Sequence, residues 1–489
     1  MTPDAAGPAR DEVGALGPVG RRAAADLGFA DDELARVEPP AEPPRWRSAL
    51  RVAELAVDSV ALASLALNAV LASRSGQPGP APVRVDGARV AASYGSDRLL
   101  RIDGTAPDVW SPLSGFWRAE DGWIRTHGNY PHHAERLRGL LGLGSDAQRA
   151  DVERAVARRS ATALEEAAAE HGALAIAVRD PQSWRAHPQA RAVAGAPLVA
   201  LDLAGPADPR RWRAATAPQR NGLPLAGVRV LDLTRVIAGP VATRDLALAG
   251  ADVLRVDSPH LPEIEWQHLD TGHGKRSTRL DLGARRDRRD FDELLASADV
   301  LALGYRPGAL ERLGLDPATL AEHRAGLVIA EVSAWGVTGP WSRRRGFDSL
   351  VQAASGIAIA ESRDAGATPG ALPVQALDHS AGHLLAAAVA TALRRQRASG
   401  GTLRVGVSLA RVAQELLEAG PAGAQPTATE DRLPTATAPL AGPEPDPPVV
   451  TTAPPPLAFA AAPEVWPRMA RPWGRDAPTW DPLPTTAHG

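Results

Sequence analysis

Short apolar runs alternate with amphipathic segments over the second half of the chain. The apolar runs read as buried strands: GVRVLDLT (227–234), ADVLRVD (251–257), DVLALGY (299–305), LVIAEVSAWG (327–336) and TLRVGVSL (402–409). The spacing of apolar residues between them predicts helices over 240–250, 290–298, 317–326 and 380–397. Because strands that alternate with helices pair side by side in one direction, the pattern predicts an α/β fold with a parallel sheet covered by helices.

The first half of the chain predicts a different organisation. A stiff proline loop at 38–45 precedes a helix over 47–73, and 83–103 is typical of two short strands with a turn. Residues 106–200 predict a smaller mixed α/β domain, and the polar, breaker-rich stretch 204–222 a linker. We therefore predict three parts, at 1–222, 223–418 and 419–489.

The last part is rich in proline and alanine. Residues 419–456 combine Pro, Ala and Thr and predict a flexible or extended segment. The following stretch VWPRMARPWGRDAPTW (465–480) has enough aromatic residues to dock on some other surface.

The two halves share a faint internal similarity. Residues 58–85 align with 378–405 at a constant offset of 320, and eight of the twenty-eight pairs are identical. Three of those pairs are alanines in alanine-rich helices, so the similarity indicates a degenerate half-repeat. It places Asp58 opposite Asp378.

Composition removes several function classes. The 489 residues carry a net charge of −3, which argues against a nucleic-acid-binding surface. Cysteine is absent, so there are no disulfides, thiolate metal sites or cysteine nucleophiles. The N-terminus lacks the pattern of a secretory signal, and the apolar run 60–72 is too short to span a bilayer. We expect a cytoplasmic protein with no membrane or nucleic-acid partner.

The first strand-to-helix turn, LTRVIAGPVATRDLA (233–247), is the natural place for a ligand. Loops at the carboxyl ends of parallel strands face a crevice, and the N-terminus of a helix there favours anions. The turn is not a G-x-G-x-x-G dinucleotide motif. The only lysine of the chain, Lys275, lies in TGHGKRSTRLDL (271–282), either as part of a solvated cation pair or as part of a site.

Six motifs in register resemble one family. They are residues 223–257, GKRSTRLDL (274–282), YRPGALERLGLD (305–316), VSAWGVTGP (332–340), GFDSLVQAASG (346–356) and LDHSAG (377–382). In this order they resemble the class III CoA-transferases of the CaiB/BaiF family over about 223–412. Residues 111–133 and 187–199 resemble the family's smaller domain, so the domain order is permuted or fused. The resemblance implies a Rossmann-like sheet.

The resemblance also implies a reaction. Asp378 matches the family's nucleophile, whose carboxylate attacks an acyl-CoA thioester to give a mixed anhydride and CoA thiolate. The thiolate then attacks the aspartyl carbonyl, and an incoming carboxylic acid completes the exchange. Asp378 is also well placed to cap a helix, and the helix dipole should keep it ionised. Coenzyme A is then substrate and product, and no cofactor is bound permanently.

Residues that match the family's CoA-binding positions follow from the same motifs. They are Arg235, Val236, Ile237, Ala238, His273, Gly274, Lys275, Arg276, Arg312, Gly346, Phe347, Asp348 and Ser349. Relatives are interlaced dimers, so we expect a homodimer or, with reordered halves, pairing inside one chain. The family's glycine-rich lid has no match here.

Two alternatives and one metal hypothesis remain. Racemases of the superfamily carry a histidine in a G-H-D motif where this chain has Phe347, which argues against proton exchange. A catalytically inactive CoA-binding subunit is the other alternative. His127, His132 and His133 form a histidine cluster, but no carboxylate pair is spaced to complete a zinc site, so we expect no metal.

Overall fold

The computed structural model describes residues 15–213, 222–423 and 433–481. Its largest element is a seven-stranded sheet with strand order β10-β9-β8-β11-β12-β13-β7. The strands are β7 (Val199–Gly205), β8 (Arg229–Leu233), β9 (Asp252–Asp257), β10 (Arg276–Arg279), β11 (Val300–Leu303), β12 (Val328–Ser333) and β13 (Thr402–Ser408). All neighbours pair in parallel except β13 and β7. The six parallel strands have the order 3-2-1-4-5-6 of the Rossmann fold.

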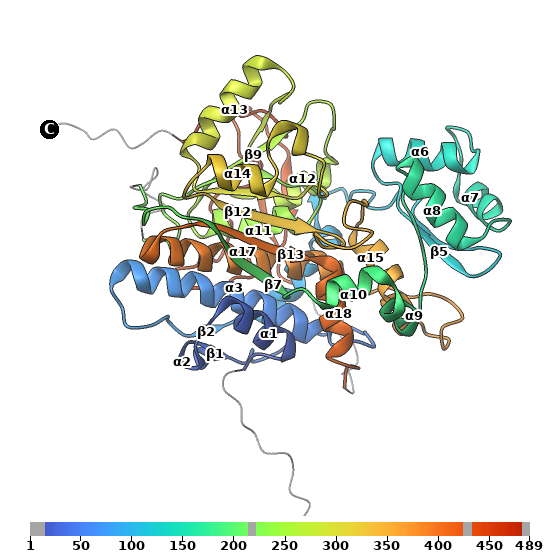
Figure 1. The fold of residues 1–489 in the computed structure, drawn as a ribbon, viewed down its shortest axis with the longest axis horizontal. Coiled ribbons are helices and arrows are strands. Elements are labelled where there is room, and N and C mark those ends of the chain that lie inside the picture. Colours follow the sequence, from blue (N-terminus) through green and yellow to red (C-terminus); the bar gives the residue numbers. More distant parts are fainter. Residues whose placement is uncertain (1–14, 214–221, 424–432, 482–489) are drawn as a thin grey trace, which may run out of the picture.

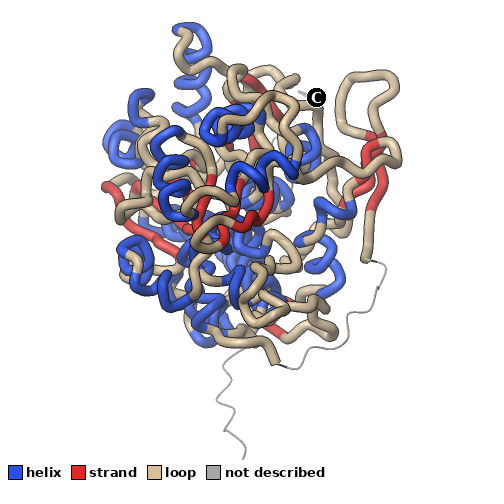
Figure 2. The backbone as a smooth tube through the Cα atoms, turned by 90° about the vertical axis from the view of Figure 1, so that its right-hand side faces the viewer, coloured by secondary structure: helices blue, strands red, loops and turns tan. Residues whose placement is uncertain are grey.

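Alternation along each strand explains why helices cover both faces of the sheet. Val230 pairs with Val253 and Val300, and this row faces one hydrophobic core. The next residues, such as Leu231, face a second core. α11 (Ala238–Leu248) and α17 (Ala376–Ser399) fill the first core, while α13 (Arg285–Ser297) and α14 (Pro317–His323) fill the second. Figure 2 shows the strands surrounded by helices.

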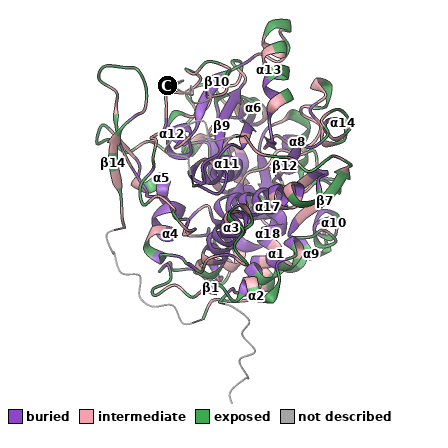
Figure 3. Ribbon diagram, turned by 90° about the vertical axis from the view of Figure 1, so that its left-hand side faces the viewer, coloured by how far each residue is buried: buried purple, intermediate pink, exposed green. Residues whose placement is uncertain are grey.

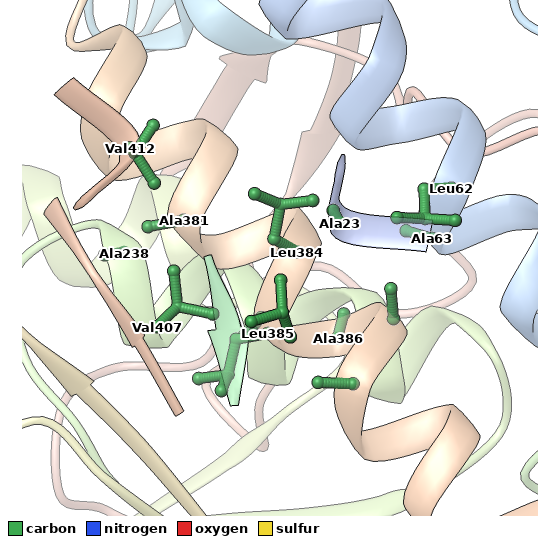
Figure 4. Close-up of a cluster of buried hydrophobic side chains, with 14 of the residues drawn as sticks. Ala23, Leu62, Ala63, Ala238, Ala381, Leu384, Leu385, Ala386, Val407 and Val412 are labelled. Carbon is green, nitrogen blue, oxygen red and sulfur yellow. The ribbon is translucent and has the colours of Figure 1, made fainter. Parts of the chain in front are cut away.

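Helix α3 (Val52–Ser75), from the N-terminal part, lies along α17 in the first core (Figure 1). In the view of Figure 4, Ala23 of α1 (Pro18–Leu27) lies between Leu384 of α17 and Leu62 of α3, and α1 contacts both of these helices. By length and composition α3 could cross a membrane, but 94% of its most apolar window is buried. Figure 3 shows α3, α11 and α17 as the buried centre of the protein. α3 therefore packs as a core helix.

A smaller lobe stands beside the sheet (Figure 1). It consists of an antiparallel sheet with three helices and has its own core between Leu113 and Ala177. Its elements are β4 (Gly115–Arg118), β5 (Trp123–Thr126), β6 (Ala175–Ala177), α6 (Pro131–Leu141), α7 (Arg149–Val156) and α8 (Ala161–His171). We call residues 113–177 the small lobe.

The remaining helices and strands lie between or beside the large sheet and the small lobe. Those before the small lobe are α2 (Asp31–Leu34), β1 (Val37–Glu38), β2 (Val83–Arg84), α4 (Gly87–Tyr94), α5 (Ser96–Leu99) and β3 (Arg101–Ile102). Those after it are α9 (Pro181–Ala186), α10 (Pro188–Ala194), α12 (Glu265–Thr271), η2 (Glu311–Leu313), α15 (Asp348–Ser355), α16 (Ile357–Ala360), α18 (Leu409–Glu418), β14 (Ala436–Pro439) and β15 (Val449–Thr452).

The predicted α/β class, with a parallel sheet and a smaller mixed unit, is confirmed. One local prediction was wrong: 83–103 is not a strand pair but contains α4 and α5 between two short strands. The missed signal is Asp86, whose carboxylate accepts the N–H groups of Ala88 and Arg89 and so starts a helix. Within 419–456, the described part includes β14 and β15, which pair with each other, and β15 also pairs with β3. Residues 424–432 lie outside the described residues.

The hydrophobic cores do not follow the boundaries that we predicted at 222 and 418. α1, α3 and β7 precede residue 222, yet they belong to the core of the parallel sheet. Beyond residue 418, Leu457, Phe459 and Trp466 join the same core. Within the predicted linker, 214–221 lies outside the described residues.

Candidate active site

A cleft of about 1070 Å³ opens at the carboxyl edge of the parallel sheet. Its floor is made by residues that end β8, β9, β11 and β12, which is the edge where open α/β sheets bind ligands. The small lobe supplies the facing wall through Tyr130, His132, His133 and Arg136 of the segment that begins α6. The cleft is thus shared by the two bodies of the chain.

Asp378 lines this cleft from the first turn of α17. The cap position of the helix is Gln375, so the predicted capping role of Asp378 was wrong. Its backbone N–H donates to Oδ2 of Asp348 at 3.0 Å, which fixes the turn. Asp348 also accepts from the side-chain amide of Gln352. The Asp378 carboxyl is therefore left to the cleft.

The pKa values of both carboxyls are raised above the usual value for aspartate. Burial, and then the negative charge of Asp348, raise the pKa of Asp378 well above the usual value for aspartate. Burial also raises the pKa of Asp348 to about 6, although hydrogen bonds from Gln352 and the backbone oppose this. We expected the helix dipole to keep Asp378 ionised, but burial and its neighbour outweigh the dipole.

The first turn after β8 is built by close packing and strain. Asp232 accepts from the backbone N–H of Thr234 at 2.9 Å, and Gly239 packs so closely on Thr234 that a Cβ would lie 2.3 Å from that side chain. Val236 has φ +72°, a left-handed conformation that a β-branched residue rarely adopts. Such strain persists where the surroundings impose it, often at functional sites. The turn projects Arg235, Val236 and Ala238 into the cleft.

Lys275 is neither solvated nor in the cleft. Its buried ammonium donates to Oδ2 of Asp232 at 3.1 Å, the carbonyl of Pro240 at 2.7 Å and the hydroxyl of Thr243 at 2.6 Å. Burial lowers the pKa of Lys275 to about 8. Burial alone would raise the pKa of Asp232, but the nearby cations hold it below its usual value. The lysine therefore supports the first turn from behind.

The neighbours of Lys275 in its motif contact the C-terminal segment. His273 lies between the hydroxyl of Thr452 and the backbone N–H of Ala470, and Arg276 pairs with Asp252 and Asp481. Gly274 donates its N–H to the carbonyl of Arg468. These contacts dock the aromatic stretch 465–480 on the edge of the sheet, as its composition predicts.

Four arginines line the cleft without a carboxylate partner among the described residues. They are Arg136 of α6, Arg306 and Arg312 after β11, and Arg345 before α15. Burial, and then the charges of Arg306 and Arg136, lower the pKa of Arg345, so the three guanidinium groups lie close together. By contrast, Arg235 is paired with Glu263 at 3.3 Å. Clustered, unpaired guanidinium groups are suited to bind phosphate.

Aromatic side chains pack around Phe347 at the cleft. The ring of Phe347 stacks on His127 with centroids 4.0 Å apart, and His133 meets it edge-on at 5.8 Å. Phe347 immediately precedes Asp348 and lines the cleft. The described residues contain no group of three or more His, Asp or Glu placed to hold a metal ion.

Comparison with known proteins decides the family. The sequence profile of CoA-transferase family III matches residues 225–483, which is more than half of the chain. The chain belongs to CoA-transferase family III. The match covers the parallel sheet, the Asp378 helix and the docked C-terminal segment.

Several members of this family are similar to the chain. An acetyl-coenzyme A transferase of Hypoxylon pulicicidum is 36% identical over 40% of this chain and 33% of its own length. A probable fatty acyl-CoA transferase of Mycobacterium tuberculosis is 34% identical over 36% of this chain and 48% of its own. The alignments thus span less than half of either relative. A solved CaiB/BaiF family protein from Brucella suis is 26% identical, with a TM-score of 0.36 over 40% of this chain and 55% of that one.

Within this family III protein, about half of the predicted site residues meet in the cleft. Asp378 lines it together with Arg235, Val236, Ala238, Arg312, Gly346 and Phe347. Ile237 precedes α11, Asp348 and Ser349 lie in the buried first turn of α15, and the stretch from His273 to Arg276 lies behind the sheet edge.

Sequence reasoning missed the residues that the small lobe brings to the cleft. Tyr130, His132, His133 and Arg136 lie 242–248 residues before Asp378 in the sequence, so no local motif joins them. The histidines were noticed only as a candidate zinc cluster. Arg344 and Arg345 also line the cleft, and the run SRRRGFD (342–348) beside a recognised motif was the available signal.

Proposed function

We propose that this protein transfers coenzyme A between an acyl-CoA thioester and a carboxylic acid, with Asp378 as the nucleophile. One observation carries the proposal: an aspartate without a capping role lines the same cleft as four unpaired arginines, at the carboxyl edge of a parallel sheet. The names of the similar CoA-transferases support it.

The chemistry begins with the ionised Asp378. One carboxylate oxygen attacks the thioester carbonyl, and CoA leaves as a thiolate, so that a mixed anhydride remains on Asp378. The thiolate attacks the aspartyl carbonyl and expels the first carboxylic acid. The carboxylate of the second acid then attacks the carbonyl of the aspartyl thioester and expels CoA thiolate, which leaves a second mixed anhydride. The thiolate attacks the acyl carbonyl of that anhydride, so the new acyl-CoA forms and Asp378 is released as the carboxylate. Asp348 orients the turn by accepting the Asp378 N–H.

The phosphates of CoA would bind the arginine cluster. The positive charges of Arg306 and Arg136 act unfavourably on Arg345, and a phosphate group would relieve that repulsion. The small lobe contributes Arg136 and the larger body contributes the others. Binding of CoA would therefore draw the two bodies together.

Two assays test this function. The wild-type protein should incorporate a labelled carboxylic acid into acyl-CoA on a panel of acyl groups. Arg345→Ala should raise the dissociation constant for CoA about tenfold or more, because it loses a charge-assisted phosphate contact. Arg343→Ala is the matched control, since Arg343 is exposed and pairs with Glu311. CoA binding with no exchange on the whole panel would contradict transfer and favour the inactive CoA-binding subunit.

One observation favours a second candidate, proton exchange at the acyl α-carbon. Phe347 cannot carry a proton, but His133 and His127 both touch its ring. Burial lowers the pKa of His127 to about 3 and that of His133 to about 2, which makes both weak bases. Deuterium wash-in at the α-carbon in heavy water would support the racemase, and its absence with active exchange would support transfer.

We also propose that the two halves of one chain pair internally. α3 and α17 are the two helices of the half-repeat, and they lie side by side in one core. α3 thereby occupies the face of α17 that a second copy of the chain would otherwise need. Sedimentation equilibrium should give the mass of a monomer, 51.1 kDa, at micromolar concentration. A stable dimer would contradict this pairing.

A further inference from the structure

His133 is a buried histidine that faces the cleft without a hydrogen-bond partner among the described residues. It lies in the first turn of α6 and lines the cleft with Asp378. It is 5% exposed, and its Nδ1 is buried and unpaired. Buried polar groups normally find partners, so an unpaired one at a cleft indicates that a ligand supplies the partner.

Other buried histidines of the chain show the contrast. His268 contacts the carbonyl of Arg471 at 2.8 Å, His273 contacts the Thr452 hydroxyl at 3.2 Å, and His383 contacts Asp245 at 2.6 Å. Each of these rings is held by the fold. His127 and His379 also have an unpaired Nδ1, but neither lines the cleft: His127 stacks on Phe347, and His379 packs on Tyr94.

Phe347 connects His133 with the turn that carries Asp378. Its ring meets the edge of the His133 ring at 5.8 Å between centroids. Phe347 directly precedes Asp348, which accepts the backbone N–H of Asp378 at 3.0 Å. His133 and Asp378 line the same cleft, so a thioester bound at Asp378 would share that cleft with the His133 imidazole.

The surroundings keep the imidazole neutral. Burial and then the nearby histidines and arginines lower the pKa of His133 to about 2. A neutral imidazole still carries one N–H, and it donates a hydrogen bond without adding a charge to the site. Triosephosphate isomerase uses a neutral histidine in this way to polarise a carbonyl, with its pKa lowered by a helix N-terminus.

We propose that His133 donates its N–H to the acyl carbonyl oxygen of the thioester bound at Asp378. The inference rests on the proposed CoA transfer. When the Asp378 oxygen forms its bond to the carbonyl carbon, the π electrons move to the carbonyl oxygen, and the His133 hydrogen bond stabilises that oxyanion. The electrons return as the C–S bond breaks and CoA thiolate leaves. No proton is transferred, so His133 is unchanged at the end of the step.

The strength of the bound carbonyl bond tests this contact directly. In the Asp378→Asn protein, which should bind acyl-CoA without turnover, a carbonyl-13C-labelled acyl-CoA should show an infrared stretch shifted to lower frequency than in water. Adding His133→Phe should abolish the shift, because Phe fills the same space without an N–H. Adding His133→Gln should retain part of it, because the amide is a neutral donor.

Kinetics of the otherwise wild-type protein provide a second readout. His133→Phe should lower kcat about 100-fold, the usual loss of one oxyanion donor, with little change in the dissociation constant for CoA. His133→Gln should recover part of that loss. His171→Ala is the matched control, because His171 is an exposed histidine at the end of α8 in the same lobe.

Each result has one meaning. An unchanged carbonyl stretch in the His133→Phe background, or unchanged kcat, would overturn the role of His133 while leaving CoA transfer intact. Failure of the Asp378→Asn protein to bind any acyl-CoA, together with absent exchange in the wild type, would overturn the proposed function and this inference with it.

Discussion

Asp58 and Asp378 occupy equivalent places in the half-repeat, yet the fold uses them in opposite ways. Asp58 lies beneath α1, where its two oxygens accept the N–H groups of Gly17 and Gly20, each at 2.8 Å. A Cβ on Gly20 would lie 2.8 Å from the Asp58 carboxyl, so the contact is closed to any ligand. Asp378 has no capping bond and lines the cleft. One aspartate holds a helix, and the other is open to a substrate.

Lys275 and Arg345 differ in the same way as the two aspartates. Lys275 has all three N–H groups of its ammonium directed to acceptors inside the protein, whereas Arg345 faces the cleft without a carboxylate partner among the described residues. Whether a charged side chain is available to a ligand therefore depends on its burial and its partners inside the protein. Its position in a motif or repeat does not determine that availability.

The largest expected effect is a loss of exchange activity that distinguishes Asp378 from Asp58. Asp378→Ala should reduce exchange of labelled carboxylate into acyl-CoA by about 1000-fold or more, because it removes the nucleophile that we propose. Asp58→Asn should leave the rate per folded molecule nearly unchanged, because Asp58 touches no substrate. Exchange assays on the two purified variants check this. Equal losses would mean that both halves of the repeat take part in catalysis.

The next effect is a loss of stability that distinguishes the buried Lys275 from Arg345, which lines the cleft. Lys275→Met should lower the free energy of unfolding by about 3–5 kcal/mol, because it leaves the Asp232 carboxylate buried without its partner. Lys275→Arg should cost about 1–3 kcal/mol through overpacking. Urea unfolding followed by circular dichroism measures both. Arg345→Met, in the cleft, should change stability little while it weakens CoA binding.

Asp58→Asn should have a smaller effect on stability, and one that depends on pH. Replacing one carboxylate oxygen by an amide removes an acceptor from the α1 cap, at a cost of about 1–2 kcal/mol. Burial raises the pKa of Asp58 from 3.8 to about 6, so the folded protein holds this proton more tightly than the unfolded chain. The Asp58 contribution to stability is therefore largest below pH 4 and decreases as the pH rises through about 6.

The corresponding measurement is urea unfolding of wild type and Asp58→Asn at pH 4 and pH 7. The stability difference between them should be larger at pH 4, because asparagine does not titrate. A difference that grows with pH would show that Asp58 is stabilised as the carboxylate, contrary to its burial.

The smallest effect concerns the pair of carboxyls in the cleft. Asp348→Asn removes the negative charge that helps to raise the pKa of Asp378. Because only the ionised Asp378 attacks, exchange should rise with pH in the wild type, and in Asp348→Asn this rise should occur at lower pH. The pH profile of kcat checks the shift. A profile that moves to higher pH would contradict the coupling of the two groups.

The fold could be predicted from the sequence because its signals are local and repeated. The strands and helices of 225–409 alternate in a simple pattern, and Asp378 was found because it lies in a motif of six residues. α4 was missed because its start depends on one capping residue, Asp86, between breaker-rich segments. The cleft wall was missed because His133 and Arg136 reach Asp378 only through the packing of the small lobe.

The role of Lys275 shows a second limit of the sequence. Its position beside a recognised motif predicted ligand contact, but burial and three internal acceptors were decided by the packing of α11 on β8 and β10. No spacing in the sequence distinguishes a lysine that faces a cleft from one that faces Asp232 behind it.

Peptide mass spectrometry after incubation with acyl-CoA tests the central claim most directly. Acid-quenched protein, digested and searched for acyl and CoA adducts, should carry the modification on the peptide that contains Asp378, and the peptide that contains Asp58 should be unmodified. The adduct should disappear in Asp378→Ala. A protein that exchanges CoA with no adduct on Asp378, or with an adduct on Asp58, would contradict the account.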